Sequence, residues 1–130
     1  MTKKYFQRFG ENLGLLILVC LTFFACKTVE STPTPEPLVN FLNKATILID
    51  EGRYSEAIEV LEQAAEAHNE SSIPLIQLGQ IYLHQQQSNL AEDAFNRALA
   101  RDLENPVAMA GLAETYLNQG NSLKALSLWK

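Results

Sequence analysis

Few side chains in this sequence have the chemistry of a reactive or metal-binding site. The two histidines, His68 and His84, lie well downstream of the two cysteines, Cys20 and Cys26, which belong to an apolar stretch. A zinc site or a cysteine nucleophile needs such groups close together. No glycine-rich phosphate loop, HExxH motif or Gly-x-Ser-x-Gly motif occurs. We therefore expect no enzymatic activity, no cofactor and no bound metal.

An acidic stripe is the remaining candidate for a cation site. Glu59, Glu62 and Glu66 follow the 3, 4 spacing of one helical face. Solvated acidic helix faces are far commoner than cation sites, so we interpret the stripe as exposed charge. From Lys27 onward, 7 Lys and Arg stand against 14 Asp and Glu, a net charge of −7. This balance argues against nucleic acid as a partner, because phosphate binding needs clustered basic residues.

The first 25 residues have the organisation of an export signal. Residues 1–12 hold three basic residues and one acid, and residues 13–26 hold no charge. As a helix, the apolar run from Leu13 to Ala25 would be roughly 20 Å long, whereas the hydrocarbon core of a bilayer is about 30 Å thick. That length is typical of a signal peptide and short for a stable span, so we assign residues 1–25 to a signal peptide.

Cys26 lies where the apolar run ends. An ordinary signal-peptidase cut after Ala25 would put the large Phe23 at a position that needs a small residue. The segment Phe23-Phe24-Ala25-Cys26 instead resembles the bacterial lipoprotein box, which it matches at Ala25 and Cys26. The resemblance implies a lipidated Cys26 thiol, cleavage before it, and acylation of the new amine, for example with palmitate. The alternative is an uncleaved anchor in which Cys26 is incidental.

Residues 26–37 form a lipidated cysteine followed by an extended tether. Two or three acyl chains would hold the protein on a membrane, since a single chain binds only marginally. Lys27, rather than Asp, follows the cysteine, and the resemblance to enteric lipoproteins then favours the outer membrane, with the domain facing the periplasm. Three prolines near the end of the segment keep it extended, with a reach of roughly 34 Å from Lys27 to Pro37.

From Leu38 onward the sequence repeats every 34 residues. Three units, beginning at Leu38, Ser72 and Pro106, keep residues of one size class at corresponding positions. Position 8 is Ala45, Gly79 and Ala113; position 20 is Ala57, Ala91 and Ala125; position 24 is Leu61, Phe95 and Trp129. This period and this pattern resemble the tetratricopeptide repeat. The resemblance implies an all-α solenoid of helix-turn-helix units, with repeats at 38–71 and 72–105 and a partial repeat at 106–130.

Apolar spacing independently predicts two amphipathic helices in each unit. Gly52 and Gly120 end the first helix of two units, whereas Gln86 at the same position predicts a less well capped turn. Lys44 occupies a position where the other units have leucine. A lysine there suits an N-terminal cap of the stack, because its ammonium can reach water. The last helix, about 122–130, is short for this family, which predicts either a truncated version of a longer protein or an end covered by another chain.

In tetratricopeptide repeat proteins the first helices line a concave groove. By resemblance, the partner-binding residues here are Leu42, Thr46, Ile49, Ile76, Gln80, Leu83, His84, Ala110, Glu114 and Leu117. None of them is Lys or Arg, which disfavours the carboxylate clamp that grips acidic chaperone tails. An apolar helix or an extended peptide suits such a groove. The alternative is that some of these residues pack between neighbouring repeats.

The sequence thus favours a membrane-anchored adaptor that binds another protein of the bacterial cell envelope through the groove. Family members with this layout act in pilus, outer-membrane or cell-wall assembly. A second hypothesis is a structural module that forms homo-oligomers through its open C-terminal repeat. A third is an accessory domain of a larger repeat protein.

Overall fold

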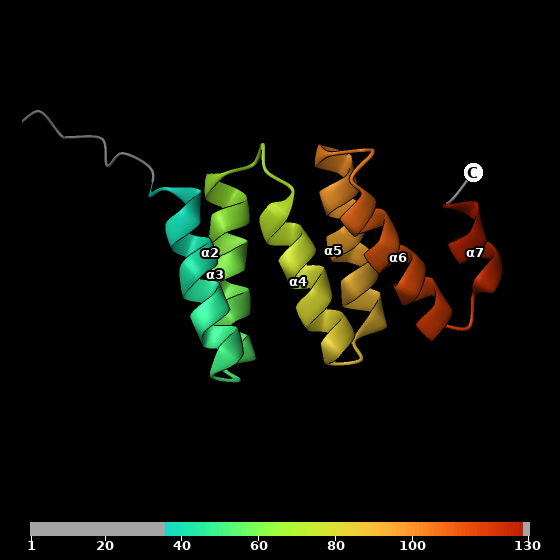
Figure 1. Cartoon of the computed structure of the whole chain (residues 1–130), viewed down its shortest axis with the longest axis horizontal. Coiled ribbons are helices and arrows are strands. Elements are labelled where there is room, and N and C mark those ends of the chain that lie inside the picture. The colour runs from blue at the N-terminus through green and yellow to red at the C-terminus, as the bar shows by residue number, and fades with distance from the viewer. Residues whose placement is uncertain (1–35, 129–130) are drawn as a thin grey trace, which may run out of the picture. The chain divides into compact units, whose positions relative to one another are not determined.

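The structure is a computed structural model that describes residues 36–128. The predicted signal peptide, Cys26 and the linker up to residue 35 lie outside these residues, as do Trp129 and Lys130. The described residues form six helices and no strand: α2 (Leu38–Asp50), α3 (Tyr54–Ala67), α4 (Ile73–His84), α5 (Ser88–Arg101), α6 (Pro106–Asn118) and α7 (Ser122–Ser127). The helices follow one another in a row (Figure 1), which confirms the predicted helical solenoid.

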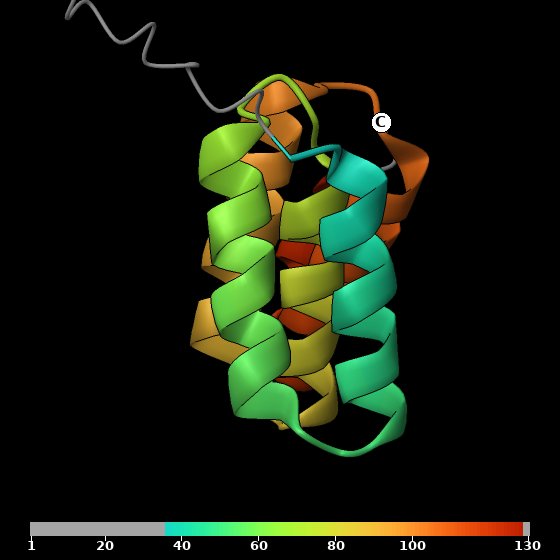
Figure 2. The ribbon, with the colours of Figure 1, turned by 90° about the vertical axis from the view of Figure 1, so that its left-hand side faces the viewer.

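Neighbouring helices in the chain pack against each other along the whole row. Seen from the N-terminal end of the stack, α2 and α3 lie side by side, with the later helices behind them (Figure 2). None of the helices described between residues 36 and 128 is both long enough and apolar enough to cross a membrane.

Each helical hairpin turns through the same backbone motif. In the first, the Arg53 N–H donates to the Leu48 carbonyl (2.8 Å) and the Gly52 N–H to the Ile49 carbonyl (2.9 Å), the paired bonds of a Schellman motif. The residue with left-handed backbone is Gly52 (φ 75°), Gln86 (φ 59°) or Gly120 (φ 75°). The turn at Gln86 keeps both hydrogen bonds. Its difference from the other two is therefore the left-handed conformation of a residue with a side chain, not a missing bond.

Small residues form the contacts between helices. The alanines at position 20, Ala57, Ala91 and Ala125, are at most 5% exposed. Large side chains fill the space that remains, led by Phe95 and Leu61, both fully buried. The alternation of small and large side chains lets the backbones approach while the interior stays filled.

Phe95 is wedged between two glycines from different helices. A Cβ atom at Gly79 of α4 would come within 2.6 Å of the Phe95 ring, and one at Gly111 of α6 would come closer still. Both distances are far below van der Waals contact, so neither position has room for a side chain while the ring stays where it is. The two glycines therefore let α4 and α6 close over a ring that α5 supplies.

Two arginines of α5 make side-chain hydrogen bonds from the second repeat to the first. Arg97 makes a two-pronged ion pair with Glu62 of α3, with N···O distances of 3.1 and 2.9 Å. Arg101 donates to the Ala65 carbonyl near the end of α3 (3.0 Å) and to the Ser71 carbonyl in the following loop (2.8 Å). Arg101 thus satisfies a carbonyl that the end of α3 leaves without a partner and holds the loop that follows.

Candidate partner-binding groove

The predicted groove residues lie on three helices, α2, α4 and α6. Six of the ten are exposed: Thr46, Gln80, His84, Ala110, Glu114 and Leu117. Three more, Leu42, Ile49 and Leu83, are half-buried and pack against the core. Ile76 is only 8% exposed, so it offers a partner little surface. The structure therefore divides the predicted set into open positions and positions that also pack between helices.

Two adjoining hollows run across these helices. The first, the α2–α4 pocket, has a volume of about 200 Å³ and is lined by Ile49, Tyr54, Gln77, Gln80, Ile81 and His84. The second, the α4–α6 hollow, has a volume of about 490 Å³ and is lined by Leu83, His84, Gln86, Ser88 and Asn118. His84 lines both hollows. The structure therefore brings Ile49, Gln80, Leu83 and His84 together along one surface from α2 to α6.

The α2–α4 pocket exists because the two helix junctions are packed differently. α4 packs directly on α6, whereas α2 and α4 contact each other much less. The sixth residue of the repeat is Gly111 in α6 but Gln77 in α4. Glycine allows α6 to approach over Phe95, while the glutamine side chain needs room at the α2–α4 junction. The sixth residue of the repeat is thus one position at which the closed junction and the open junction differ.

Sequence reasoning missed two polar residues of the α2–α4 pocket. The side-chain oxygen Oε1 of Gln77 is buried and accepts no hydrogen bond. The ring of Tyr54 lies 5.3 Å from that of His84, with an angle of 33° between their planes. The available signal was the polar pair Gln77 and Gln80, one helical turn apart within the otherwise apolar run of α4.

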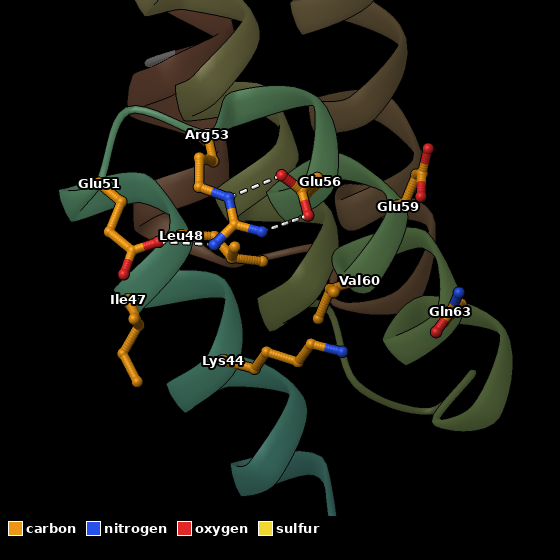
Figure 3. Close-up of a pocket in the computed structure, with 9 residues that line it drawn as sticks. All are labelled: Lys44, Ile47, Leu48, Glu51, Arg53, Glu56, Glu59, Val60 and Gln63. Carbon is orange, nitrogen blue, oxygen red and sulfur yellow. Dashed lines mark hydrogen bonds and ion pairs between the residues drawn. The ribbon is translucent and has the colours of Figure 1, made fainter.

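A third hollow lies at the outer end of the stack, between α2 and α3 (Figure 3), and has a volume of about 490 Å³. Its charges largely neutralise one another. Arg53 donates to Glu56 (2.6 and 2.5 Å) and to Glu51 (2.8 Å). These hydrogen bonds raise the pKa of Arg53, and the same contact lowers the pKa of Glu56. Because Arg53 is already paired with two carboxylates, this hollow is a weaker candidate than the surface across α2, α4 and α6.

The same end face carries Lys44, whose side chain reaches across the hollow (Figure 3). In the second repeat the corresponding residue, Leu78, is fully buried. A charged residue at this position agrees with a first repeat that ends the stack toward solvent.

A family profile described as tetratricopeptide repeat matches residues 48–104, from the last turn of α2 to the loop before α6. The match includes every residue that lines the α2–α4 pocket and ends before α6. The chain contains a tetratricopeptide repeat (TPR) domain. Its first helices, α2, α4 and α6, are those that line the groove in TPR folds.

The TPR domain is similar in fold to the globular C-terminal domain of P. aeruginosa LpoP. The two share 23% sequence identity, with a TM-score of 0.64 over 73% of this chain and 93% of that one. No curated protein sequence matches the chain. At this identity the likeness to LpoP is one of fold.

Proposed function

We propose that the protein is a lipid-anchored TPR adaptor of the bacterial cell envelope, which binds an apolar segment of another envelope protein along α2, α4 and α6. The observation that carries the proposal is the continuous surface formed by the α2–α4 pocket and the α4–α6 hollow, which adjoin at His84. TPR domains act through protein binding, and this surface is the one on which their first helices converge.

The charge of this surface narrows the class of partner. None of the side chains that line the two hollows is Lys or Arg. Asp50 and Glu114 are exposed on α2 and α6, where the groove positions lie. A basic partner segment would meet complementary potential here and a neutral one would meet no repulsion, whereas an acidic tail would be repelled.

Anchoring at Cys26 is the second part of the proposal. It is supported by the uncharged run at residues 13–26, by the cysteine that ends it and by the proline-rich tether that follows. LpoP offers a precedent for the layout, because its similar domain is described as a C-terminal one. A lipid at Cys26 would present the TPR domain within reach of proteins on the same membrane, most simply on the periplasmic side of the outer membrane.

The proposal is of a binding protein rather than an enzyme. Within residues 36–128 no three His, Cys, Asp or Glu side chains gather into a metal-binding group. His84 pairs with the ring of Tyr54, and His68 contacts the Glu36 carbonyl (2.8 Å). Both histidines thus take part in packing and hydrogen-bonding contacts, His68 also with the ring of Phe41.

The test is capture of envelope proteins from solubilised membranes, with the full lipidated chain as bait. Leu117 in the groove is 57% exposed, so L117E is expected to fold and to lose the captured partner. L103E changes an exposed leucine in the loop before α6, outside the groove, and is the matched control. If L117E and L103E capture the same protein equally well, the groove is not the binding surface.

Self-association is a second candidate function, supported by α7. Leu123 is 82% exposed and Leu126 is 61% exposed on this short helix. Two such leucines on one helix could pair with the same helix of a second copy. Sedimentation equilibrium of the full chain in detergent should then show a dimer that L123K abolishes, whereas a monomer at all concentrations would exclude this candidate.

A further inference from the structure

We propose that the edge of the stack where α2, α4 and α6 begin is a second docking surface, which binds a basic segment of a partner protein that is also rich in aliphatic residues. This surface, the loop edge, consists of six residues just before and at the start of these helices: Glu36, Val39, Glu70, Ile73, Glu104 and Val107. None of the six lines the α2–α4 pocket or the α4–α6 hollow. The proposal thus concerns a surface other than the groove and does not depend on it.

The same pair of residues recurs at the loop edge in every unit. A glutamate stands three residues before a valine or isoleucine: Glu36 before Val39, Glu70 before Ile73 and Glu104 before Val107. Both members of the pair recur at the 34-residue period of the fold. The start of α2 and the loops before α4 and α6 lie at one edge of the stack (Figure 1). The period therefore places a row of carboxylates and a row of branched apolar side chains along this edge.

The apolar row is exposed, although the residues that follow it in the same helices are not. Val39 is 56% exposed, Ile73 46% and Val107 50%. Leu75 of α4 and Ala108 of α6, which come one or two residues after the row, are fully buried. Single exposed apolar residues are ordinary in soluble domains, whereas grouped ones mark interaction surfaces. An exposed β-branched residue at the start of all three first helices is a grouped feature of this kind.

The row of glutamates does not serve to cap the helices. The first turns of α2, α4 and α6 contain no acidic residue. No side chain caps α2 or α4, and Asn105 caps α6. All three glutamates are exposed, and the one basic group that contacts their carboxylates within residues 36–128 is His68, whose Nδ1 lies 3.6 Å from Glu70. The carboxylates therefore face solvent, where a partner can reach them.

The charge of the loop edge selects a basic occupant. Residues 36–40, 68–74 and 102–108 contain four acidic residues and neither Lys nor Arg. A lysine or arginine of a partner can pair its charge with a glutamate while its methylene stem covers the neighbouring valine or isoleucine. Nucleic acid or an anionic lipid surface would be repelled by the same carboxylates. A segment with several Lys or Arg among aliphatic residues therefore matches both rows.

The test uses synthetic peptides and the full chain purified in non-ionic detergent, with detergent alone as the blank. The probe is a short fluorescein-labelled peptide of repeated Lys-Val-Ala units. In one control peptide Glu replaces each Lys, and in the other Ser replaces each Val. We expect the Lys-Val-Ala peptide to bind, the Glu peptide not to bind, and the Ser peptide to bind about tenfold more weakly because it buries less apolar surface. No binding of the Lys-Val-Ala peptide, or equal binding of the Glu peptide, would overturn the proposal.

The site of binding is mapped on the ¹⁵N-labelled chain. The Lys-Val-Ala peptide should shift the amide signals of residues 36–39, 70–73 and 104–107. Shifts centred on the residues that line the two hollows would overturn the proposal, because the peptide would then occupy the groove.

Charge-reversal variants test the row of glutamates. E70K/E104K should weaken binding of the Lys-Val-Ala peptide about tenfold, since two favourable charge pairs become repulsive. E59K/E66K makes the same change in net charge at exposed positions of α3 and is the matched control. Equal losses in the two double variants would mean that net charge, and not the loop edge, attracts the peptide.

A second pair of variants tests the apolar row without changing charge. V39T/V107T keeps the shape of both side chains but replaces a methyl group of each by a hydroxyl, and should weaken binding about threefold. I47T changes an isoleucine that is 58% exposed on the outer end face and should leave the affinity unchanged. An unchanged affinity in V39T/V107T would show that the apolar row takes no part.

Two further arms separate the loop edge from a lipid surface and from the groove. The full chain reconstituted in phosphatidylcholine vesicles should still bind the Lys-Val-Ala peptide. Binding that is present in detergent and lost in vesicles would mean that the edge lies on lipid, and the proposal would be wrong. L117E should lose the partner captured by the groove and keep the peptide. If L117E loses the peptide as well, the loop edge is not a separate surface, while the adaptor function stands.

Discussion

At the scale of single residues, backbone conformation and close contacts set the local stability. Gln86 adopts the left-handed conformation that Gly52 and Gly120 adopt in the other two hairpin turns. A residue with a side chain pays roughly 1–2 kcal/mol for this conformation, which a glycine would avoid. A glycine at this position would offset part of this stabilisation, because glycine loses more conformational entropy on folding.

Q86G should therefore raise the free energy of unfolding by about 0.5–1 kcal/mol in urea denaturation. The mirror experiment is G52A, which should lower it. A Cβ at Gly52 meets no atom within 4 Å, so only the backbone can respond. If Q86G destabilises the protein, the Gln86 side chain contributes more than its conformation costs.

For Gly111 we predict the opposite effect of adding a side chain from that expected in an open helix, because the Phe95 ring lies against it. Helix propensity alone would favour alanine there by about 1 kcal/mol. The Phe95 ring blocks the added methyl group, so we expect G111A to destabilise the domain by about 1–3 kcal/mol. The double variant G111A/F95L should recover part of the loss in thermal unfolding. A G111A domain more stable than the parent would mean that Phe95 can move aside.

Two partly buried tyrosines should make the folded domain less stable at alkaline pH. Burial, helped by the negative charge of Glu62, raises the pKa of Tyr82, and burial raises the pKa of Tyr116 as well. A raised pKa means that the neutral form stabilises the folded state. This stability is complete below about pH 10, the pKa of an unfolded tyrosine, and is lost as the pH rises through the higher folded value.

The melting temperature should accordingly fall as the pH is raised above about 10. Y82F removes one of the two tyrosines with a raised pKa and should make this decline shallower. Y54F, which changes a tyrosine in the α2–α4 pocket, serves as the comparison. An identical decline in Y82F and the parent would assign the alkaline limit to other groups.

At the scale of helices, the joint between α3 and α4 depends on a side chain from α5. Arg101 bridges the Ala65 and Ser71 carbonyls across this joint. The loop between α3 and α4 is therefore held in place by a residue 30 or more positions away in the chain.

R101M keeps much of the apolar stem but removes both hydrogen bonds. We expect it to cost about 1.5–3 kcal/mol, since the donor is charged, and to speed amide hydrogen exchange around residues 65–72 first. R53M, which removes an arginine paired at the exposed end face, should cost much less, because exposed ion pairs contribute little to stability. Uniformly faster exchange over all helices would mean that Arg101 supports the whole stack and not this joint.

At the scale of the whole molecule, the two candidate roles place binding and anchoring in separate segments. The groove belongs to residues 36–128, and the predicted lipid site belongs to the segment before them. Loss of the anchor should therefore leave binding in solution intact while changing where the protein is found.

C26S expressed in a bacterium should lose its lipid label and keep its uncleaved size. Labelling with an alkyne analogue of palmitate and gel mobility would measure both. C20S is the matched control, because Cys20 lies within the apolar run and should not be modified. A C26S protein that is labelled as strongly as the parent would exclude Cys26 as the lipid site.

The sequence by itself determined the helices and their pairing. The small residues at positions 8 and 20 and the glycines at the turns are signals within one unit, and the 34-residue period follows from comparing the units along the sequence. The groove positions could be assigned to helices in the same way. Their exposure could not, as the burial of Ile76 shows.

Only the tertiary structure decided where the stack is closed and where it is open. The wedge of Phe95 between Gly79 and Gly111, the pocket beside Gln77 and the reach of Arg101 to Ala65 each join residues from different helices. Their geometry follows from the spacing of whole helices, which all the side chains of a junction set together. A periodic pattern names the residues at each junction but does not fix the distance that separates them.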